Sequence, residues 1–400
     1  MSGKDVHVVE LFAGVGGFRC GLERASPRFK TIWANQWEPG SSKQHAFQCY
    51  VSHYGPSENH VNEDIAVAKE RVPEHDFLVG GFPCQDYSVA RTKAEGIVGK
   101  KGVLWWSIDS IISDREPPYV LLENVDRLIR SPSTQRGRDF AIILRCLFDK
   151  GYMVEWRVIN AAEYGQPQKR RRTFIFACKK GTALYDELAD RGFEDIVMKE
   201  GFFARGFPIK GPVAGRSKIL SINKEKYPSL VDISNDFQDT FYNGGVMRDG
   251  EIYTRSCDPD HDGEQRKLRD MLSGSVDEKY FVTDVEKWKY LKGSKRMERT
   301  RTSDGGKYFY SEGSIPFPDR LDIPGRTMLT SEGKVNRSSH IIADGDRFRV
   351  LTPEECERLN GFDVGWTDKG MPESARYFTM GNALVVPLIE KMGRVLDELL

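Results

Sequence analysis

The stretch VHVVELFAGVGGFRCGL, residues 6–22, passes from an apolar run into glycines and then into a segment with helical spacing. The apolar run is typical of a buried strand. Gly14, Gly16 and Gly17 would let the backbone turn sharply and approach a ligand at the start of the helix, although such glycines also make ordinary strand-to-helix turns. Their spacing is not G-x-G-x-x-G, and no basic residue stands among them, so a nucleoside cofactor without a pyrophosphate suits the turn better than NAD.

The same order of strand and helix continues through the first part of the chain. Strand-like runs at 31–35, 76–81 and 119–124 follow the first one, and stretches with helical spacing separate them. This alternation predicts an α/β fold with a doubly wound, mostly parallel sheet whose two faces are covered by helices. Runs 153–159 and 172–178 are joined without a helix, which predicts an antiparallel hairpin at one edge of the sheet.

The alternation ends near residue 181, which suggests a second domain. Residues 181–325 are rich in Gly, Pro and aromatic residues and show no long periodic helix. We therefore expect a catalytic and cofactor-binding domain over 1–180 and a smaller, irregular domain over 181–371, of which 181–325 is the variable part. The amphipathic C-terminal helix, within 372–400, should pack back on the first domain.

One predicted helix near the end of the second domain has clear signals at both of its ends. In LTPEECERLNGF, Thr352 and Glu355 would form a capping box, Pro353 suits the first turn, and Gly361 would end the helix.

Composition limits the class of protein. The chain has 400 residues, and 59 Lys and Arg balance 59 Asp and Glu. No run approaches the roughly 18 apolar residues of a membrane helix, and the N-terminus lacks the order of a signal peptide, so we expect a cytoplasmic protein. Seven cysteines without a C-x-x-C pair indicate neither a zinc site nor a disulfide framework, and we expect no metal.

Charge is concentrated locally. Residues 287–307 hold eight Lys and Arg against two acidic residues, a net of 8 − 2 = +6. Lys292, Lys295, Arg296 and Arg299 of this segment could contact phosphates, or the segment could be a solvated charged face.

Three segments at predicted strand ends carry reactive groups. Cys84 lies in GGFPCQ, directly after the run 76–81, where helix N–H groups could lower its pKa and favour the nucleophilic thiolate. Glu123 ends the next strand in ENV. In QPQKRRR, period two would align Arg170 and Arg172 on one side of the returning strand. A nucleophile, a carboxyl group and two arginines are thus expected on one rim of the sheet.

Two further strand ends could hold the cofactor. In NQWEP, Trp37 could stack on an adenine ring, and in NEDI, Asp64 could accept a hydrogen bond from an adenine amino group. Core packing of Trp37 and an exposed loop position for Asp64 are the alternatives.

Together these segments resemble the DNA (cytosine-5) methyltransferase family of bacterial and phage restriction–modification systems. The resemblance covers nearly the whole chain, in the order FAGVGGF, NEDI, GGFPCQDYS, GVLWWSI, ENV, NAAEYGQPQKRRR, RTMLTSEGKVNRSSHII and MGNALVVP. It implies a Rossmann-like catalytic domain that uses S-adenosylmethionine, without a metal, and a target-recognition domain. The substrate would be a cytosine flipped out of a specific duplex DNA sequence.

The resemblance also implies residue roles. Cys84 would add to carbon 6 of the cytosine, Glu123 would serve ring nitrogen 3, and Arg172 would hold the oxygen at carbon 2, with Arg170 in the same catalytic set. The implied cofactor contacts are Phe12, Ala13, Gly14, Gly16, Gly17, Gln36, Trp37, Asp64, Ile65, Pro83 and Asn382. One position departs from the family, which has an acidic residue where Gln36 stands; either Gln36 or Glu38 would then hold the cofactor ribose.

Partners and alternatives follow from the same resemblance. We expect a monomer that binds double-stranded DNA in the cytoplasm, at the nucleoid, with no membrane contact; a cognate restriction endonuclease, where one exists, would act separately. A tRNA methyltransferase relative would carry a Cys-Phe-Thr tripeptide, which is missing here. An NAD-dependent oxidoreductase lacks its glycine pattern, and a catalytically silent DNA-binding protein would not need every chemical residue of the family.

Overall fold

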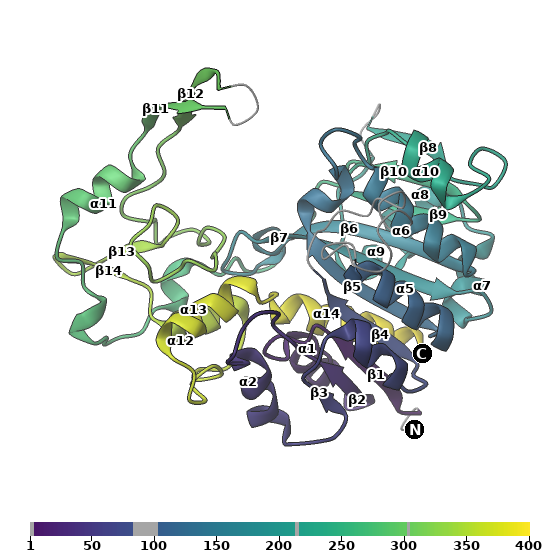
Figure 1. The fold of residues 1–400 in the computed structure, drawn as a ribbon, viewed down its shortest axis with the longest axis horizontal. Helices are drawn as coiled ribbons and strands as arrows, with labels where there is room; N and C mark the ends of the chain where they lie inside the picture. The colour runs from purple at the N-terminus through teal and green to yellow at the C-terminus, as the bar shows by residue number, and fades with distance from the viewer. Residues whose placement is uncertain (1–3, 83–102, 213–215, 302–304) are drawn as a thin grey trace. The chain divides into compact units, whose positions relative to one another are not determined.

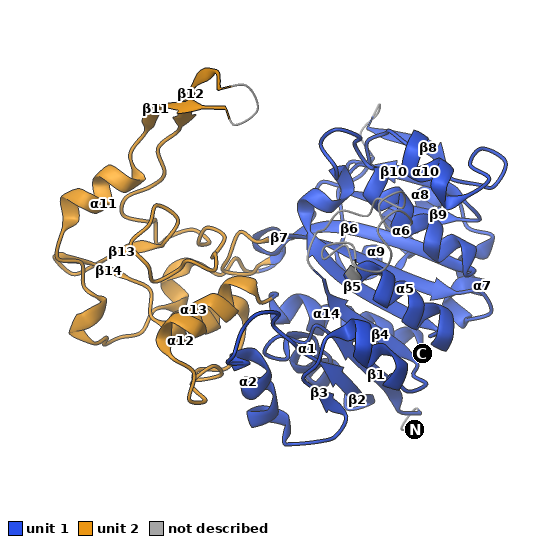
Figure 2. Cartoon of the chain, viewed as in Figure 1, with its two compact units in different colours: residues 1–164, 171–263, 384–400 blue, residues 165–170, 264–383 orange. Residues whose placement is uncertain are grey.

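The computed structural model describes residues 4–82, 103–212, 216–301 and 305–400 (Figure 1). The chain forms two compact units (Figure 2). Unit 1 comprises residues 1–164, 171–263 and 384–400, and unit 2 comprises 165–170 and 264–383. This division differs from the domain boundary predicted at residue 180, because residues 181–263 belong to the unit that contains the large sheet.

Unit 1 is built on one ten-stranded sheet. Five neighbouring strands run parallel, in the order β3 (His60–Val61), β2 (Phe29–Asn35), β1 (Val6–Leu11), β4 (Phe77–Gly81) and β5 (Tyr119–Val125). Five antiparallel strands continue it, in the order β7 (Arg171–Lys179), β6 (Tyr152–Asn160), β9 (Gly244–Arg248), β10 (Glu251–Arg255) and β8 (Ser217–Ser221). The predicted α/β fold with its parallel sheet is confirmed.

The antiparallel hairpin exists, but its predicted place at the sheet edge is wrong. β6 pairs with β9 as well as with β7, and β10 and β8 follow. β6 is therefore an interior strand, and β8 lies at this edge of the sheet. The strands that cover β6 come from the region that the sequence assigned to the second domain.

Helices cover both faces of the sheet, as a doubly wound fold requires. Successive residues of β5 belong to opposite faces, so Val120 and Leu122 join one apolar cluster and Tyr119 and Leu121 join the other. The helices of unit 1 are α1 (Gly17–Ala25), α2 (His45–Tyr54), α3 (Ile65–Ala68), α5 (Val103–Arg115), α6 (Arg138–Asp149), α7 (Ala183–Ala189), α8 (Phe193–Asp195), α9 (Phe202–Gly206), α10 (Leu230–Asp236) and α14 (Val386–Leu399).

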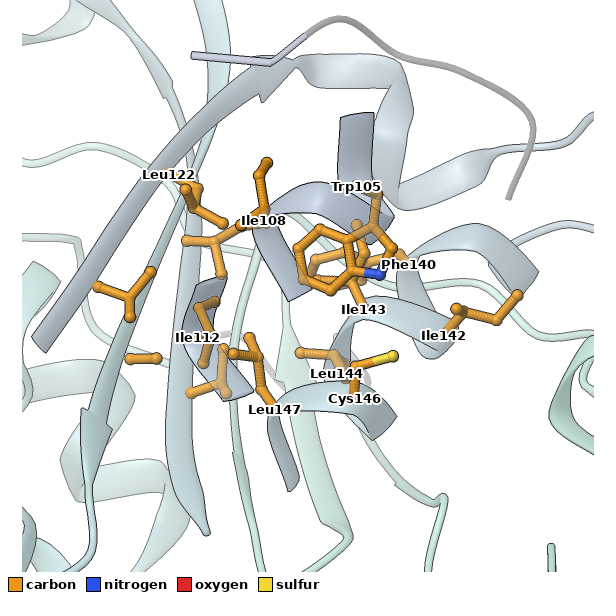
Figure 3. Close-up of a cluster of buried hydrophobic side chains, with 14 of the residues drawn as sticks. Trp105, Ile108, Ile112, Leu122, Phe140, Ile142, Ile143, Leu144, Cys146 and Leu147 are labelled. Atoms are coloured by element: carbon orange, nitrogen blue, oxygen red, sulfur yellow. The ribbon is translucent and has the colours of Figure 1, made fainter. Parts of the chain in front are cut away.

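The cluster between β5, α5 and α6 is shown in Figure 3. Trp105, Ile108 and Ile112 of α5 belong to the same apolar cluster as Leu122 of the strand. On α6 the labelled side chains are Phe140, Ile142, Ile143, Leu144, Cys146 and Leu147. This packing holds the carboxyl ends of β4 and β5 in a fixed frame, which is the edge where ligands bind in open α/β sheets.

The end of the chain returns to unit 1, as predicted. α14 packs against α1, and two glycines let their backbones approach closely. A Cβ on Gly21 would lie 2.6 Å from Ile389 Cβ, and one on Gly393 would lie 2.7 Å from Ala25 Cβ. The C-terminal segment 372–400 is two helices rather than one, since α13 (Glu373–Asn382) belongs to unit 2 and ends ahead of Pro387.

Unit 2 is irregular and has two small ribbons. Its helices include α11 (Val285–Lys292), α12 (Pro353–Asn360) and α13, and its strands pair as β11 (Lys295–Thr300) with β12 (Lys307–Glu312) and β13 (Ile341–Asp344) with β14 (Arg347–Val350). The predicted capping box is confirmed: Glu355 N–H donates to Thr352 Oγ1 over 3.2 Å, and Thr352 N–H to Glu355 Oε2 over 2.9 Å. Gly361 ends α12 with φ 77°.

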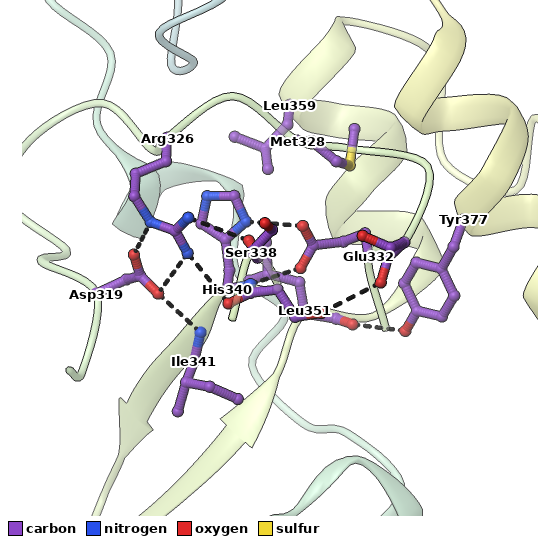
Figure 4. Close-up of polar contacts among 12 residues, drawn as sticks. Asp319, Arg326, Met328, Glu332, Ser338, His340, Ile341, Leu351, Leu359 and Tyr377 are labelled. Carbon is purple, nitrogen blue, oxygen red and sulfur yellow. Dashed lines mark hydrogen bonds and ion pairs between the residues drawn. The ribbon is translucent and has the colours of Figure 1, made fainter. Parts of the chain in front are cut away.

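Buried charged side chains form a network of polar contacts within unit 2 (Figure 4). Asp319 Oδ2 accepts from Ile341 N–H over 2.8 Å, and its Oδ1 accepts from Arg326 Nε over 2.6 Å. Burial alone would raise the pKa of Asp319, but Arg326, His340 and Lys292 lower it to about 2. Next to it, His340 Nδ1 lies 3.0 Å from Glu332 Oε2, with both side chains buried. These pairs fix the RTMLTSEGKVNRSSHII segment.

No helix within the described ranges is both long enough and apolar enough to cross a membrane.

Candidate active site

Glu123 and Arg172 form an ion pair at the carboxyl end of β5. Arg172 Nε lies 2.7 Å from Glu123 Oε1, and both side chains are partly buried, with 14% of the Glu123 surface and 18% of the Arg172 surface exposed. The antiparallel register pairs Glu123 with Phe174 and Val125 with Arg172, so the two charged residues are diagonal neighbours on one face. The sequence places these two residues on one rim of the sheet, and in the structure their side chains are in contact.

The neighbouring strand β4 leaves room for this carboxyl group. Gly81 is opposite Glu123 in the parallel register, and a Cβ on Gly81 would lie 3.1 Å from Glu123 Oε2. Phe82 N–H then donates to the carbonyl oxygen of Glu123 over 3.2 Å. Cys84 and Pro83, which the sequence places next, lie outside the described residues.

Arg170 does not share the setting predicted for it. Arg170 and Arg172 would point to the same side only if both lay in one strand, but β7 begins at Arg171. Arg170 is buried in unit 2, where Nη1 donates to Met328 O over 3.1 Å and Nη2 to Gly381 O over 2.9 Å. Its guanidinium therefore crosslinks the backbone of unit 2.

The glycine turn after β1 has an unusual backbone. Phe12 has φ 54°, a rare conformation for a residue with a side chain, and Gly14 and Gly16 have φ 58° and 87°. Ala13 N–H donates to Asn35 O over 2.8 Å, which joins the turn to the end of β2. Such strain is maintained only where the surroundings fix it, and it is concentrated at ligand sites.

A cluster of polar side chains contacts the glycine turn and the start of α1. Glu10 of β1 is fully buried, and its Oε1 accepts from Arg19 N–H over 3.4 Å in the first turn of α1. Burial raises the pKa of Glu10 to about 7. The guanidinium of Arg19 lies 3.9 Å from the centre of the Tyr54 ring, whose hydroxyl donates to Gly16 O over 3.4 Å. The sequence alone indicates no role for Glu10, Arg19 or Tyr54, since their meeting depends on the packing of α1 and α2.

The end of β2 carries the residues expected to hold the adenosine part. Gln36 Oε1 accepts from Gly14 N–H over 2.7 Å, so this side chain fixes the glycine turn directly. Trp37 is 37% exposed, which is more than core packing would leave. Glu38 is half-buried, and burial raises its pKa.

The other predicted cofactor residues take distinct positions. Asp64 Oδ1 accepts from Ala66 N–H over 2.9 Å and caps α3, and Ile65 is buried behind it. Gly17 begins α1. Asn382 is the last residue of α13 and is exposed in unit 2. Among the described residues, no group of three His, Cys, Asp or Glu side chains could hold a metal ion.

One residue of the basic segment is not available to a ligand. Lys292 is buried, and its Nζ donates to Asp319 Oδ2 over 2.9 Å and to Ser339 O over 2.8 Å. The prediction that it contacts phosphate together with Lys295, Arg296 and Arg299 does not suit this position. The other three side chains lie on the exposed ribbon of β11.

Known proteins are similar to this chain in sequence and in fold. The sequence profile of C-5 cytosine-specific DNA methylases matches residues 6–398. The Type II methyltransferase M.Sau3AI of Staphylococcus aureus is 48% identical over 98% of this chain and 96% of its own length. M.HaeII of Haemophilus aegyptius, also a Type II methyltransferase, is 30% identical over 57% of this chain and 68% of its own. The solved S. pombe Dnmt2 methyltransferase has a similar fold, with a TM-score of 0.58 at 17% identity over 98% of both chains.

The family profile spans nearly the whole chain, and the relative from Staphylococcus aureus aligns from end to end. The chain belongs to the C-5 cytosine-specific DNA methylase family.

Proposed function

We propose that this chain transfers a methyl group from S-adenosylmethionine to carbon 5 of a cytosine that is flipped out of a specific duplex DNA sequence. The ion pair of Glu123 and Arg172 carries the proposal. It lies at the end of β5, beside the strand whose end leads to Cys84 within three residues of Gly81. A carboxyl group and a guanidinium at this edge can serve a flipped pyrimidine ring.

The residues around the glycine turn fit the cofactor. A Cβ on Gly14 would have no neighbour within 4 Å, so the turn is open on that side, and Trp37 exposes an aromatic face at the adjoining strand end. Trp37 would stack on the adenine, Asp64 would accept from its amino group, and Gln36 or Glu38 would bind the ribose. The proposed contacts also include Phe12, Ala13, Gly16, Gly17, Ile65, Pro83 and Asn382.

Each catalytic residue has a separate task. S-adenosylmethionine supplies an electrophilic methyl group when bound. The Cys84 thiolate forms a bond to carbon 6, which breaks the aromaticity of the ring and makes carbon 5 nucleophilic. Glu123 holds a proton at ring nitrogen 3, and Arg172 stabilises the oxygen at carbon 2 while it orients Glu123. Loss of the proton at carbon 5 and release of Cys84 then restore the aromatic ring.

The relatives suggest a biological setting. M.Sau3AI and M.HaeII are both named as Type II methyltransferases, so we propose that this chain protects DNA from a separate restriction endonuclease. It would act as a monomer in the cytoplasm, bound to the nucleoid through its DNA substrate.

Trapping the covalent intermediate tests this function. Duplex DNA with 5-fluorocytosine at the target should form a stable adduct, because fluorine at carbon 5 cannot leave as a proton does. We expect a retarded band on a denaturing gel with wild-type protein and none with Cys84→Ser, which should still bind S-adenosylmethionine. Transfer of a labelled methyl group should occur on duplex DNA and not on tRNA. Substantial turnover by the serine variant, or a preference for tRNA, would contradict the proposal.

A further inference from the structure

The ribbon of β11 and β12 has no core of its own. Its register pairs Lys295 with Glu312, Met297 with Tyr310 and Arg299 with Tyr308, and these six side chains share one face. We call it the tyrosine face. The opposite face carries Arg296, Glu298 and Thr300 with Lys307, Phe309 and Ser311. Met297, Tyr308 and Phe309 are exposed to 36%, 39% and 60%, which is unusual for large apolar side chains in a two-stranded ribbon.

Two arginines of the ribbon are held on aromatic rings. The guanidinium of Arg299 lies 3.8 Å from the centre of the Tyr310 ring on the tyrosine face, and that of Arg296 lies 4.4 Å from the centre of the Phe309 ring on the other. Among the described residues, neither forms an ion pair with a carboxylate. Stacking uses the flat face of a guanidinium and leaves its edge N–H groups free to donate to a partner.

The base of the ribbon is fixed to the rest of unit 2. Arg337 Nη1 donates to Glu312 Oε2 over 2.9 Å and to Gly293 O over 3.3 Å, and Nη2 donates to Gly313 O. Ile315 N–H donates to Lys292 O over 2.9 Å, and the side chain of the same lysine forms the buried ion pair with Asp319. Arg337 thus joins the two strands of the ribbon at its base. Beyond this base, β11 and β12 project from unit 2 (Figure 1).

We propose that the ribbon enters the major groove of the target duplex with its tyrosine face toward the bases, and that Arg299 donates to a base edge there. The proposal rests on the proposed function, since it names the element that reads the substrate. The major groove is about 12 Å wide and admits a two-stranded ribbon, and its bases offer the bidentate acceptors that an arginine fork recognises.

Charge decides which face meets the bases. On the tyrosine face, the carboxylate of Glu312 is neutralised by Arg337, which leaves Lys295 and Arg299 as positive charges. On the opposite face, Glu298 is exposed and pairs with Lys307 over 2.6 Å. Since Lys307 neutralises Glu298, the opposite face keeps one net positive charge, from Arg296, against two on the tyrosine face. We therefore expect the opposite face to point away from the bases, with Arg296 near a phosphate.

Arginine-to-lysine exchanges in the full-length protein test the proposal, because lysine keeps the charge but not the planar fork. Wild-type protein and each variant would methylate a pool of duplexes with random sequence, and bisulfite sequencing would give the preference at every position. Arg299→Lys should lower discrimination at one base pair by roughly 5- to 140-fold, the worth of one bidentate contact. Tyr310→Leu removes the supporting ring and should relax the same base pair.

Two matched variants serve as controls. Arg296→Lys alters the opposite face of the ribbon and should leave the sequence preference unchanged. Arg347→Lys alters another exposed arginine that lies over a ring, 4.0 Å from the centre of Phe281, outside the ribbon. Thermal unfolding would show whether each variant is folded.

The outcomes separate this proposal from the function on which it rests. An unchanged preference for folded Arg299→Lys, an equal loss of activity on all sequences, or relaxation only in Arg296→Lys would overturn the assignment of the tyrosine face. Failure of wild-type protein to methylate any duplex would instead contradict the proposed function.

Discussion

Asn124 Nδ2 donates to the carbonyl oxygen of Phe82 over 2.8 Å, and Asn124 Oδ1 accepts the N–H of Val125 over 2.8 Å. The side chain is 1% exposed, so water does not compete for either hydrogen bond. The end of β5 therefore holds the end of β4 only two residues before Cys84 in the sequence. The ENV motif supplies a carboxyl group and, through its middle residue, a support for the strand end that leads to Cys84 in the sequence.

Asn124→Ala should lower the rate of methyl transfer by about 10- to 100-fold, because a small displacement of Cys84, the proposed nucleophile, would have a large effect on rate. Cofactor affinity should stay within about twofold of wild type. Single-turnover methylation and calorimetric titration would measure the two quantities. Asn35→Ala is the matched control: Asn35 is also a buried asparagine at a strand end, but it donates to Glu63 O over 2.8 Å beside Asp64, so it should weaken cofactor binding instead. The same pattern in both variants would refute the distinction.

Arg172→Lys should reduce turnover by about 100-fold, since lysine cannot donate through a planar fork to Glu123 and the cytosine together. Arg171 provides the control. It is adjacent in sequence but exposed, and its Nε lies 3.9 Å from Asp126 Oδ2. Steady-state kinetics of Arg171→Lys should match wild type, and equal losses in the two variants would show that the pair of Arg172 with Glu123 has no special role.

Gln36 is expected to serve the cofactor site by fixing Gly14. Gln36→Leu removes the acceptor of the Gly14 N–H and should weaken S-adenosylmethionine binding by about tenfold. Gln36→Glu keeps an acceptor and introduces the acidic group usual in the family, so its affinity should equal or exceed that of wild type. Glu38→Gln should change affinity little. Equilibrium dialysis with labelled cofactor would measure all three, and a large loss only in Glu38→Gln would assign the ribose contact to Glu38.

Local patterns allowed much of this site to be predicted from the sequence. The alternation along the strands, the glycine turn after β1 and the capping box are each formed by residues close together in the sequence. The structure confirms the capping box of Thr352 and Glu355. Glu123 and Arg172 could also be placed on one rim, because both stand at ends of predicted strands; the structure adds that these strands are adjacent.

Contacts between distant segments could not be predicted in the same way. Nothing near Lys292 in the sequence indicates Asp319, and a basic run resembles a solvated face until its burial is known. The pairing of β6 with β9 depends on the return of residues 181–263 to the sheet, and the position of Arg170 depends on the distant carbonyl groups of Met328 and Gly381. The structural propensity of a residue and the period of the hydrophobic pattern are local properties, so they cannot predict packing between distant segments.

Glu155 should make stability depend on pH. It is buried, its Oε1 accepts from Phe202 N–H over 2.8 Å at the start of α9, and burial raises its pKa to about 7. A carboxyl group with a raised pKa binds more protons in the folded state, so stability should be greatest below about pH 4.5 for this group and fall as pH rises to about 7. The full effect is on the order of 3 kcal/mol.

Glu155→Gln removes this titration and should reduce the loss of melting temperature between pH 5.5 and 8. Glu10, whose pKa burial also raises to about 7, would retain its own share of the pH dependence. Glu187→Gln, an exposed carboxyl group paired with Arg205, is the control and should follow wild type. Identical slopes for wild type and Glu155→Gln would contradict the prediction.

Lys292 and Lys295 are three residues apart and should behave in opposite ways. Burial lowers the pKa of Lys292, and Asp319 partly opposes this effect. Lys292→Met leaves Asp319 and Arg326 without their third charged partner, and breaking such a buried pair costs about 3–5 kcal/mol of stability. Lys295→Met should leave stability within about 0.5 kcal/mol, since Lys295 belongs to the exposed ribbon. Urea unfolding would measure both variants.

DNA binding should show the reverse order. Neutralising Lys295, Arg296 and Arg299 should flatten the dependence of log K on log salt by up to about 0.9 for each phosphate that no longer has a cationic partner. Folded Lys292→Met should keep the wild-type slope, because its ammonium group is enclosed by Asp319 and Ser339. A variant of Lys292 that is as stable as wild type, but binds DNA with a reduced salt slope, would mean that this lysine contacts phosphate.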